Sequence, residues 1–294
     1  MAKIEINKEK CIRCGACIKD CVAYSIEAGS DLYPQTANGG EERCIGCTHC
    51  MAICPVGAIS INDKNPDNSL NPALPNSDEV LGLIQTRRSI RQYKAEDISP
   101  ELFEKLKSML PYIPTGCNVN SLHFSFIETR SAMDAIRNYV RIKLLKILNS
   151  SFMPKLASKF ASYKTAFENG EDVIFRDAPH MVVVSSHIHA PCTNVDPIIA
   201  LSYIELYAHS LGLGTCWCGF AQACFKLLPR LSEMVQIPDE YKPVYVMLLG
   251  YPAVKYHRTT QPESFPIAEI REIQDVNMSW TQKARRILLN FIRG

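Results

Sequence analysis

The 294-residue sequence lacks several features that would each mark a class of protein. No uninterrupted apolar stretch reaches the roughly 18 residues that a membrane-spanning helix needs, so we expect no such helix. The formal net charge is only +2, which does not indicate a general binder of nucleic acid. A Gly-x-Gly-x-x-Gly fingerprint is also missing, so the sequence gives no sign of a separate dinucleotide-binding domain.

The first ten residues, MAKIEINKEK, contain no apolar stretch of the kind found in secretory signal peptides. We therefore expect a cytoplasmic protein in a compartment reducing enough to keep its cysteines out of disulfides. The chain is 47% hydrophobic and 21% charged, a composition that can bury a sizeable core. Its length suits about two domains.

What the sequence does contain is cysteine, and eight of the thirteen residues fall in two copies of one pattern. The copies are Cys11-x2-Cys14-x2-Cys17-x3-Cys21 and Cys44-x2-Cys47-x2-Cys50-x3-Cys54, the second followed by Pro55. This is the bacterial run for cubane iron–sulfur clusters, in which one tight loop supplies three thiolates. Zinc is an alternative, but zinc sites usually pair two Cys-x2-Cys turns across a longer spacer.

Through these two runs, residues 1–61 resemble a bacterial two-cluster ferredoxin, with a departure at Val22, where a proline often follows the fourth cysteine. In such ferredoxins the fourth ligand of each cluster comes from the other run. The resemblance therefore implies two [4Fe-4S] clusters, one held by Cys11, Cys14, Cys17 and Cys54 and the other by Cys44, Cys47, Cys50 and Cys21.

Residues 62–76 are rich in Asn, Pro and Asp, which predicts a linker before a second domain over residues 77–294. That domain alternates helical and strand patterns, so the fold class is α+β, with a central sheet covered by helices. The predicted helices begin at Ser77, follow Ser99 and cover 197–211; the predicted strands cover 123–128, 181–185 and 244–249.

The second domain carries a cluster of cations, Arg87-Arg88-Ser89-Ile90-Arg91, which suits a phosphate but alone is more often a solvated face. Further motifs follow in order: residues 114–120 (PTGCNVN), 211–219 (LGLGTCWCG) and 249–252 (LGYP), then Arg258. Together these motifs resemble the nitroreductase family of FMN flavoproteins over residues 78–270.

That resemblance implies a homodimer with FMN bound at its interface, and it assigns roles by position. Arg87 and Ser89 would hold the FMN phosphate with Arg88 beside them, and Arg258 would be a second phosphate cation. Arg91 would face the pyrimidine edge of the flavin, where a guanidinium stabilises the reduced form. The remaining predicted contacts are Asn118, Asn120 (where many relatives have Gln), Cys216, Trp217, Cys218 and Gly219. No catalytic residue is assigned.

Two segments extend beyond these motifs. A basic insertion at about 134–170 lies where relatives place lid helices over the flavin, and its residues 137–164 hold seven Lys or Arg and no Asp or Glu. The insertion is either a packed helix with a solvated basic face or an attractor of an anionic substrate or acidic partner. A basic, amphipathic C-terminal arm ends the chain and is expected to wrap onto the partner subunit.

The combination predicts an FMN-dependent oxidoreductase whose clusters relay single electrons to FMN. The expected donor is a reduced ferredoxin or a similar low-potential carrier, and the acceptor is a small nitroaromatic, quinone or activated alkene. One alternative reverses the flow, with NAD(P)H reducing FMN and the clusters exporting electrons. Another is a redox carrier or sensor without turnover.

Overall fold

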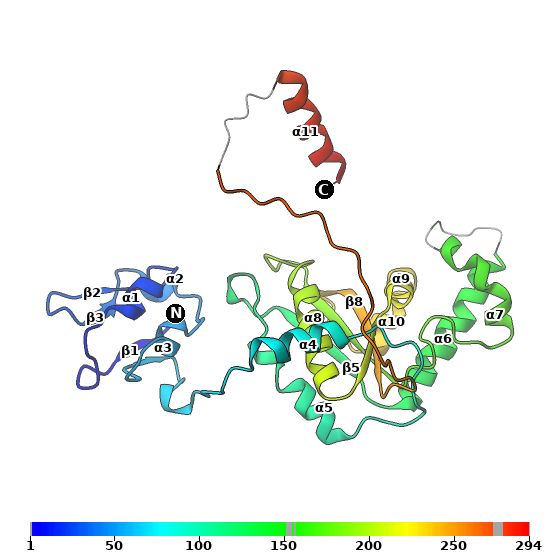
Figure 1. The fold of residues 1–294 in the computed structure, drawn as a ribbon, viewed down its shortest axis with the longest axis horizontal. Coiled ribbons are helices and arrows are strands. Elements are labelled where there is room, and N and C mark those ends of the chain that lie inside the picture. Colours follow the sequence, from blue (N-terminus) through cyan, green and yellow to red (C-terminus); the bar gives the residue numbers. More distant parts are fainter. Residues whose placement is uncertain (1, 151–154, 156, 273–278, 294) are drawn as a thin grey trace. The chain divides into compact units, whose positions relative to one another are not determined.

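The computed structural model describes residues 2–150, 155, 157–272 and 279–293. The chain divides into two compact units, Met1–Arg258 and Thr259–Gly294, and each is described by itself. The expected α+β class is confirmed, because helices and sheet are interspersed along the first unit (Figure 1).

The cysteine-rich region is built from two short antiparallel strand pairs and three short helices. Strand β1 (Ile4–Ile6) pairs with β4 (Ile59–Ile61), and β2 (Ile26–Ala28) pairs with β3 (Pro34–Thr36). The helices are α1 (Ala16–Asp20), α2 (Gly40–Arg43) and α3 (His49–Ala52). A small core of Cys17, Ile26, Ile59 and Ile61 lies between them. So little buried apolar surface indicates that bound clusters supply part of the folding free energy.

The predicted linker contains one short 3-10 turn, η1 (Pro66–Asn68), before α4 (Ser77–Thr86) begins. Helix α4 begins at Ser77, as its sequence pattern indicated, and Asn76 is its N-cap. The Asn76 side chain accepts from the Glu79 backbone N–H, and the Glu79 carboxylate accepts from the Asn76 backbone N–H. This reciprocal capping box satisfies two amide groups that the helix itself leaves unpaired. Ser99 caps α5 (Pro100–Lys107) as expected.

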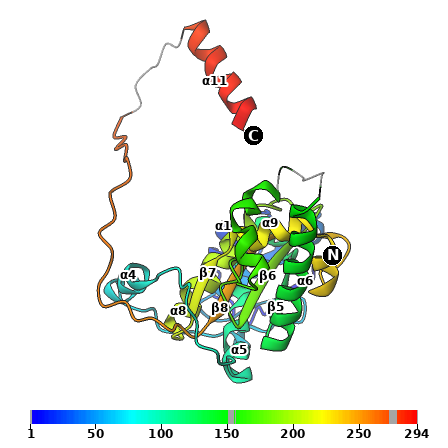
Figure 2. The same cartoon turned by 90° about the vertical axis from the view of Figure 1, so that its right-hand side faces the viewer.

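The central sheet has four antiparallel strands in the order β5-β6-β8-β7. Their bounds are β5 Leu122–Ile127, β6 His180–His187, β7 Gly214–Trp217 and β8 Tyr241–Gly250. Strand β6 is buried along nearly its whole length because helices cover both faces of the sheet (Figures 1 and 2). Alternate residues of β6 therefore pack into different cores. Met181 and Val183 belong to the first core, and Val182 and Val184 belong to the second.

The helices that cover the sheet belong to these two cores. Helices α6 (Arg130–Leu148), α9 (Gly219–Leu227) and α10 (Arg230–Met234) contribute to the first core, and α5 and α8 (Asp196–Ser210) to the second. Short turns η2 (Leu110–Tyr112) and η3 (Gly116–Asn118) connect α5 to β5. The sheet edge next to α8 is where several predicted flavin contacts lie.

The basic insertion is helical, consisting of α6, η4 (Ala157–Tyr163) and α7 (Lys164–Glu168). Helix α6 buries Met133, Ile136, Val140 and Leu144 on one face. Its cations mostly point elsewhere, and Lys143 lies over the ring of Tyr139. The insertion is therefore a packed helix with a basic face, and its attraction of an anionic ligand remains a prediction.

Among the described residues of the second unit, one helix forms, α11 (Trp280–Arg293), which corresponds to the predicted C-terminal arm. Lys283 lies over the ring of Trp280. Within the described ranges, no helix of either unit is both long and apolar enough to cross a bilayer.

Candidate functional site

Two small cavities divide the eight cysteines of the N-terminal region into the two predicted groups. One cavity is lined by Cys21, Cys44, Cys47 and Cys50, and the other by Cys11, Cys14, Cys17 and Cys54. The last cysteine of each run thus lies with the first three of the other run. This is the grouping that crossed ligation requires, and the assignment of individual ligands remains a prediction.

The two loops repeat the same backbone conformation. Left-handed φ angles occur at Arg13 and Gly46, each two residues after the first cysteine of its run, and again at Gly15 and Thr48. The fourth cysteine of each run also accepts a hydrogen bond from a backbone N–H group. The Ser25 N–H donates to Cys21 Sγ at 3.3 Å and the Ala58 N–H donates to Cys54 Sγ at 3.2 Å. Such N–H···S bonds stabilise thiolate ligands and tune cluster potential.

Burial keeps the central cysteines protonated when no cluster is bound. It raises the pKa of Cys50 to about 12, with smaller contributions from Cys21 and its neighbours, and burial also raises the pKa of Cys17. Cluster assembly therefore has to release protons from these thiols. Among the described residues, no three His, Cys, Asp or Glu side chains are close enough to share one metal ion.

The cation cluster of the second domain is placed against strand β7. Arg87 caps the end of α4, and the chain then runs beside β7, where Ser89 bridges Thr215 and the Ile90 N–H donates to the Thr215 carbonyl at 2.8 Å. A Cβ on Gly214 would lie 2.7 Å from Ile90 Cγ1, so this close approach requires glycine. Sequence-distant residues 87–91 and 214–219 are thereby brought together.

Arg88 is a half-buried cation, and only some of its guanidinium nitrogens have a hydrogen-bond partner. Its Nη1 donates to the backbone carbonyls of Gln85 and Arg87, whereas its buried Nε and Nη2 have no partner. Buried donors are almost always paired, so two vacant ones on a guanidinium indicate an anionic partner. A phosphate fits this requirement.

Arg87, which is predicted to hold the FMN phosphate, forms an ion pair with Glu205 in this structure. Its Nη1 donates to Glu205 Oε1 at 3.0 Å, and the Glu205 carboxylate is only 10% exposed. One helical turn further along α8, His209 Nε2 lies 3.0 Å from Thr86 Oγ1. Burial, together with the charge of Arg87, lowers the pKa of His209 and favours its neutral form. Glu205 and His209 were missed in the sequence, although their i, i+4 spacing places them on one helix face.

The predicted loop 216–219 is the end of a strand and the start of a helix. Cys216 and Cys218 are both buried in the core on the α6 side of the sheet, whereas Trp217 faces the other core and packs on Tyr245. Gly219 begins α9, which Cys218 caps by accepting the Ala221 N–H. Burial raises the pKa of Cys216 and raises that of Cys218 to about 11. Burial therefore favours the neutral form of both thiols over the thiolate.

The other predicted flavin contacts lie elsewhere along α8. The Gly116 N–H donates to Asp196 Oδ2 at 3.0 Å, which ties the loop containing Asn118 and Asn120 to the first turn of α8. Asp196 and Glu205 are nine positions apart on this helix, which is about 14 Å along its axis. No hydrogen bond or ion pair among the described residues joins Asn118 or Asn120 to the Arg87–Cys216 group.

Asn118 instead reaches the cysteine-rich region. Its Nδ2 donates to the backbone carbonyl of Ile45 at 3.0 Å, and Ile45 lies between Cys44 and Cys47. Asn120 donates to the Asn118 carbonyl at 3.3 Å within its own loop. Arg258 is exposed beyond the end of β8 and has no partner among the described side chains. These three positions remain predicted flavin contacts.

Comparison with known proteins gives the family. The model for the nitroreductase family matches residues 84–251, more than half of the chain, and the model for a 4Fe-4S dicluster domain matches residues 4–61. The chain belongs to the nitroreductase family. Its N-terminal region is a ferredoxin-like dicluster domain, and the expected ferredoxin and nitroreductase resemblances are both confirmed.

Individual relatives agree with this assignment. A protein of Methanothermobacter thermautotrophicus named NADH dehydrogenase/NAD(P)H nitroreductase is 30% identical over 182 residues, 60% of this chain and 78% of the relative. A ferredoxin of Chlorobaculum thiosulfatiphilum is 41% identical over 54 residues, 17% of this chain and 87% of the ferredoxin. An FMN-bound nitroreductase structure from Desulfitobacterium hafniense has a TM-score of 0.53 at 23% identity, covering 67% of this chain and all of that one.

This nitroreductase-family protein is thus an oxidoreductase whose dicluster domain holds two [4Fe-4S] clusters, and the solved Desulfitobacterium hafniense relative binds FMN. The donor set fits both groups: two sets of four thiols for the clusters, and a half-buried, incompletely bonded guanidinium for a phosphate. When bound, the clusters transfer electrons singly and FMN exchanges them in pairs.

We expect Arg87→Gln to weaken FMN binding about 10- to 150-fold, because the variant loses one charge-assisted hydrogen bond to the phosphate. The same change leaves the buried Glu205 carboxylate unpaired, which destabilises the domain as well. Glu205→Gln separates the two effects, because it removes the negative charge and keeps Arg87. Equilibrium titration with FMN should show unchanged or tighter binding in Glu205→Gln. Equal FMN affinity in Arg87→Gln and wild-type protein would contradict the phosphate role.

Proposed function

We propose that the two clusters of this oxidoreductase relay electrons from a reduced low-potential carrier, such as a ferredoxin, to FMN, and that the flavin reduces a small organic acceptor. A nitroaromatic, a quinone or an activated alkene is a suitable acceptor. The observation that carries the proposal is the hydrogen bond from Asn118 to the Ile45 carbonyl, inside the loop of Cys44 and Cys47.

The hydrogen bond between Asn118 and Ile45 supports the relay because of the two segments that it connects. Asn118 lies in a loop that the nitroreductase resemblance assigns to the flavin, and Ile45 lies between two predicted cluster ligands. A cluster is useful to a flavin in the same chain only if the two are near each other. The contact supports an order in which the cluster of Cys21, Cys44, Cys47 and Cys50 is the nearer one, and the cluster of Cys11, Cys14, Cys17 and Cys54 receives electrons first.

The proposal includes a homodimer with FMN at its interface. In one chain the predicted flavin contacts fall into two groups that lie about 14 Å apart along α8, one near Asp196 and the other near Glu205. A second copy that presents its Asn118 loop to the Arg87 group would complete one site from two chains. The cytoplasmic location and the role of the C-terminal arm stay predictions.

A second candidate function is electron flow in the opposite direction. The Methanothermobacter relative is named for NADH and NAD(P)H, which favours a nicotinamide as the reductant of FMN in that protein. Anaerobic stopped-flow mixing distinguishes these two directions of electron flow. Our proposal expects fast FMN reduction by reduced ferredoxin and slow reduction by NADH or NADPH, and the opposite ranking would establish cluster-mediated export.

We expect Asn118→Ala to slow ferredoxin-driven reduction of bound FMN about 2- to 10-fold, because one hydrogen bond of about 0.5–1.5 kcal/mol no longer holds the cluster loop. The measurement uses protein saturated with FMN, so weaker flavin binding does not enter the rate. Ser121→Ala is the matched control, since Ser121 Oγ bonds only the Val119 carbonyl in the same loop. Identical relay rates in Asn118→Ala and Ser121→Ala would remove the contact from the pathway.

A further inference from the structure

The loop between the basic insertion and strand β6 has an unusual backbone. Two successive residues, Arg176 and Asp177, both have a φ of 53°. Left-handed conformations are uncommon outside glycine, and they persist only where the surroundings hold them in place. Such outliers gather at binding sites, so the loop is a candidate for a specific task.

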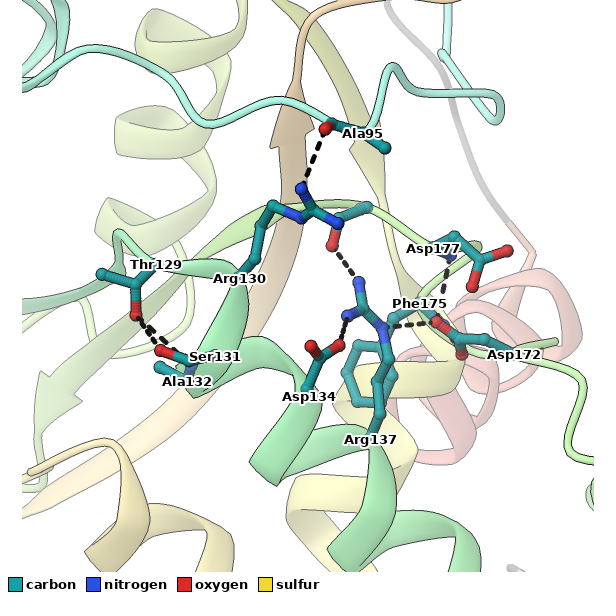
Figure 3. Close-up of polar contacts among 11 residues, drawn as sticks. Ala95, Thr129, Arg130, Ser131, Ala132, Asp134, Arg137, Asp172, Phe175 and Asp177 are labelled. Atoms are coloured by element: carbon teal, nitrogen blue, oxygen red, sulfur yellow. Dashed lines mark hydrogen bonds and ion pairs between the residues drawn. The ribbon is translucent and has the colours of Figure 1, made fainter.

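A buried ion pair holds this loop, as Figure 3 shows. Arg137 Nε donates to Asp172 Oδ2 at 2.9 Å, and both side chains are largely buried, at 18% and 11% exposure. The same Asp172 carboxylate accepts the N–H groups of Phe175 at 2.8 Å and Asp177 at 3.0 Å. Arg137 Nη2 also donates to the Ala178 carbonyl. The pair therefore grips the loop on both sides of Arg176.

The loop lies against the part of the chain that is predicted to contact the flavin. Cys218 Sγ donates to the Ile174 carbonyl at 3.2 Å. On the other side of the loop, Pro179 packs closely on Gly250, which also lies beside the ring of Tyr93. The loop is thus attached to Cys218, the residue after β7, and to the end of β8.

The charge of Arg176 acts on the same groups as that of Arg91. Burial raises the pKa of Cys216, and the guanidinium groups of Arg91 and Arg176 both oppose that rise. The same two cations oppose the upward shift of the pKa of Tyr93 that burial causes. Two guanidinium groups from segments 85 positions apart therefore act on the same two side chains, Cys216 and Tyr93. Arg91 comes from the cation cluster, and Arg176 comes from the clamped loop.

Arg176 is also free to bind a ligand. Its side chain is exposed and, within the part of the chain that the structure describes, has no hydrogen bond or ion pair. Arg137, 39 positions earlier, uses all of its donor nitrogens on Asp134, Asp172 and Ala178. Arg137, whose guanidinium nitrogens are all hydrogen-bonded, thus holds the strained loop, and the loop presents Arg176, whose guanidinium is available to a ligand.

We propose that Arg176 determines specificity by binding an anionic group, a carboxylate or a phosphate, on the organic acceptor, and that the Arg137–Asp172 pair positions it. The inference rests on the proposed reduction of an acceptor at the flavin. It narrows the acceptor to one that carries a negative charge. Arg91 serves the flavin and Arg176 the acceptor, so the two cations have separate partners.

The test compares two acceptors of the same shape, 4-nitrobenzoate and its neutral amide, 4-nitrobenzamide. Each is mixed anaerobically with FMN-loaded full-length protein whose flavin has been reduced, and flavin reoxidation is followed. Arg176→Gln should lower kcat/KM for 4-nitrobenzoate by at least about ten-fold, mainly through KM, and leave 4-nitrobenzamide within about two-fold. Glutamine is as strained as arginine in this backbone conformation, so the variant removes only the charge.

Arg230→Gln is the matched control. Arg230 is an exposed cation over the ring of Tyr139, so its loss changes the net charge equally but leaves the clamped loop intact. An unchanged ratio of the two acceptors in Arg176→Gln, or the same change in Arg230→Gln, would overturn the proposal. Weaker FMN binding in Arg176→Gln with no change in the acceptor ratio would assign Arg176 to the flavin instead and also overturn it.

Asp172→Asn tests the positioning role, because it removes the charge that binds Arg137 while keeping the size of the side chain. The ratio of 4-nitrobenzoate to 4-nitrobenzamide activity should fall at least about three-fold, with FMN content unchanged. A fall in both activities by the same factor would show a merely structural clamp. If Asp172→Asn does not accumulate as folded protein, Arg137→Lys keeps the charge but loses the planar set of donors, and the same ratio applies.

A binding measurement separates this inference from the proposed function. Calorimetric titration of the oxidised, FMN-loaded protein with 4-nitrobenzoate needs no electron transfer. If neither acceptor reoxidises the wild-type flavin, the proposed acceptor reduction fails, and loss of 4-nitrobenzoate binding in Arg176→Gln would still support the anion site. If both acceptors are reduced but binding is equal in the variant and the wild type, only the role of Arg176 fails.

Discussion

Removal of residues 1–75 should leave a protein that binds FMN but has lost at least about 99% of its ferredoxin-driven turnover. The predicted flavin motifs all lie after Asn76, and the nitroreductase family model matches residues 84–251, which the truncation leaves intact. The truncation keeps Asn76 because its capping box starts α4, and losing such a cap costs about 1 kcal/mol. Turnover is measured with reduced ferredoxin and, separately, with dithionite.

Dithionite is the control because it can reduce a flavin directly. The truncated protein should retain dithionite-driven reduction of a nitroaromatic, and its FMN content should match that of the full-length protein. Ferredoxin-driven turnover at the full-length rate in the truncated protein would end the relay model. The dicluster domain would then need another role, such as electron export or support of the nitroreductase domain.

Those parts of the fold whose cause is local were predictable from the sequence. The cysteine runs impose left-handed turns at fixed offsets, so two equivalent loops follow from two equivalent patterns, even though Arg13 and Thr48 occupy positions where glycine would be easier. The apolar run 181–185 is buried on both sides in β6, as its lack of alternation indicated. Ser99 followed by Pro100 marks a helix start for purely local reasons.

The rest depends on packing between distant segments. Arg87 was assigned to a phosphate by resemblance, but its ion pair with Glu205 arises only because α4 packs on α8, 118 residues later in the sequence. Nothing near Arg176 distinguishes it from other exposed cations, and its position depends on a clamp that begins at Arg137. The contact between Asn118 and Ile45 joins two predicted domains, so neither segment alone could indicate it.

Cys54→Ala should remove the cluster that also depends on Cys11, Cys14 and Cys17, and lower the iron content from about eight to about four per chain. The reason is the shared cavity, in which Cys54 lies with these three cysteines rather than with its sequence neighbour Cys50. Iron and sulfide analysis of anaerobically purified protein gives the count. Cys192→Ala is the control, since Cys192 packs against Gly116 in the other domain and should leave eight irons.

Double substitutions identify which cluster is lost. If Cys14 and Cys54 hold the same cluster, Cys14→Ala/Cys54→Ala should retain the same four irons as either single variant. If Cys47 belongs to the other cluster, Cys47→Ala/Cys54→Ala should retain none. The reverse pattern, with no further loss on adding Cys47→Ala, would mean that each run closes on its own cluster. Reduction of FMN by reduced ferredoxin should fail in every one of these cysteine-to-alanine cluster variants, because the proposed relay needs both clusters in series.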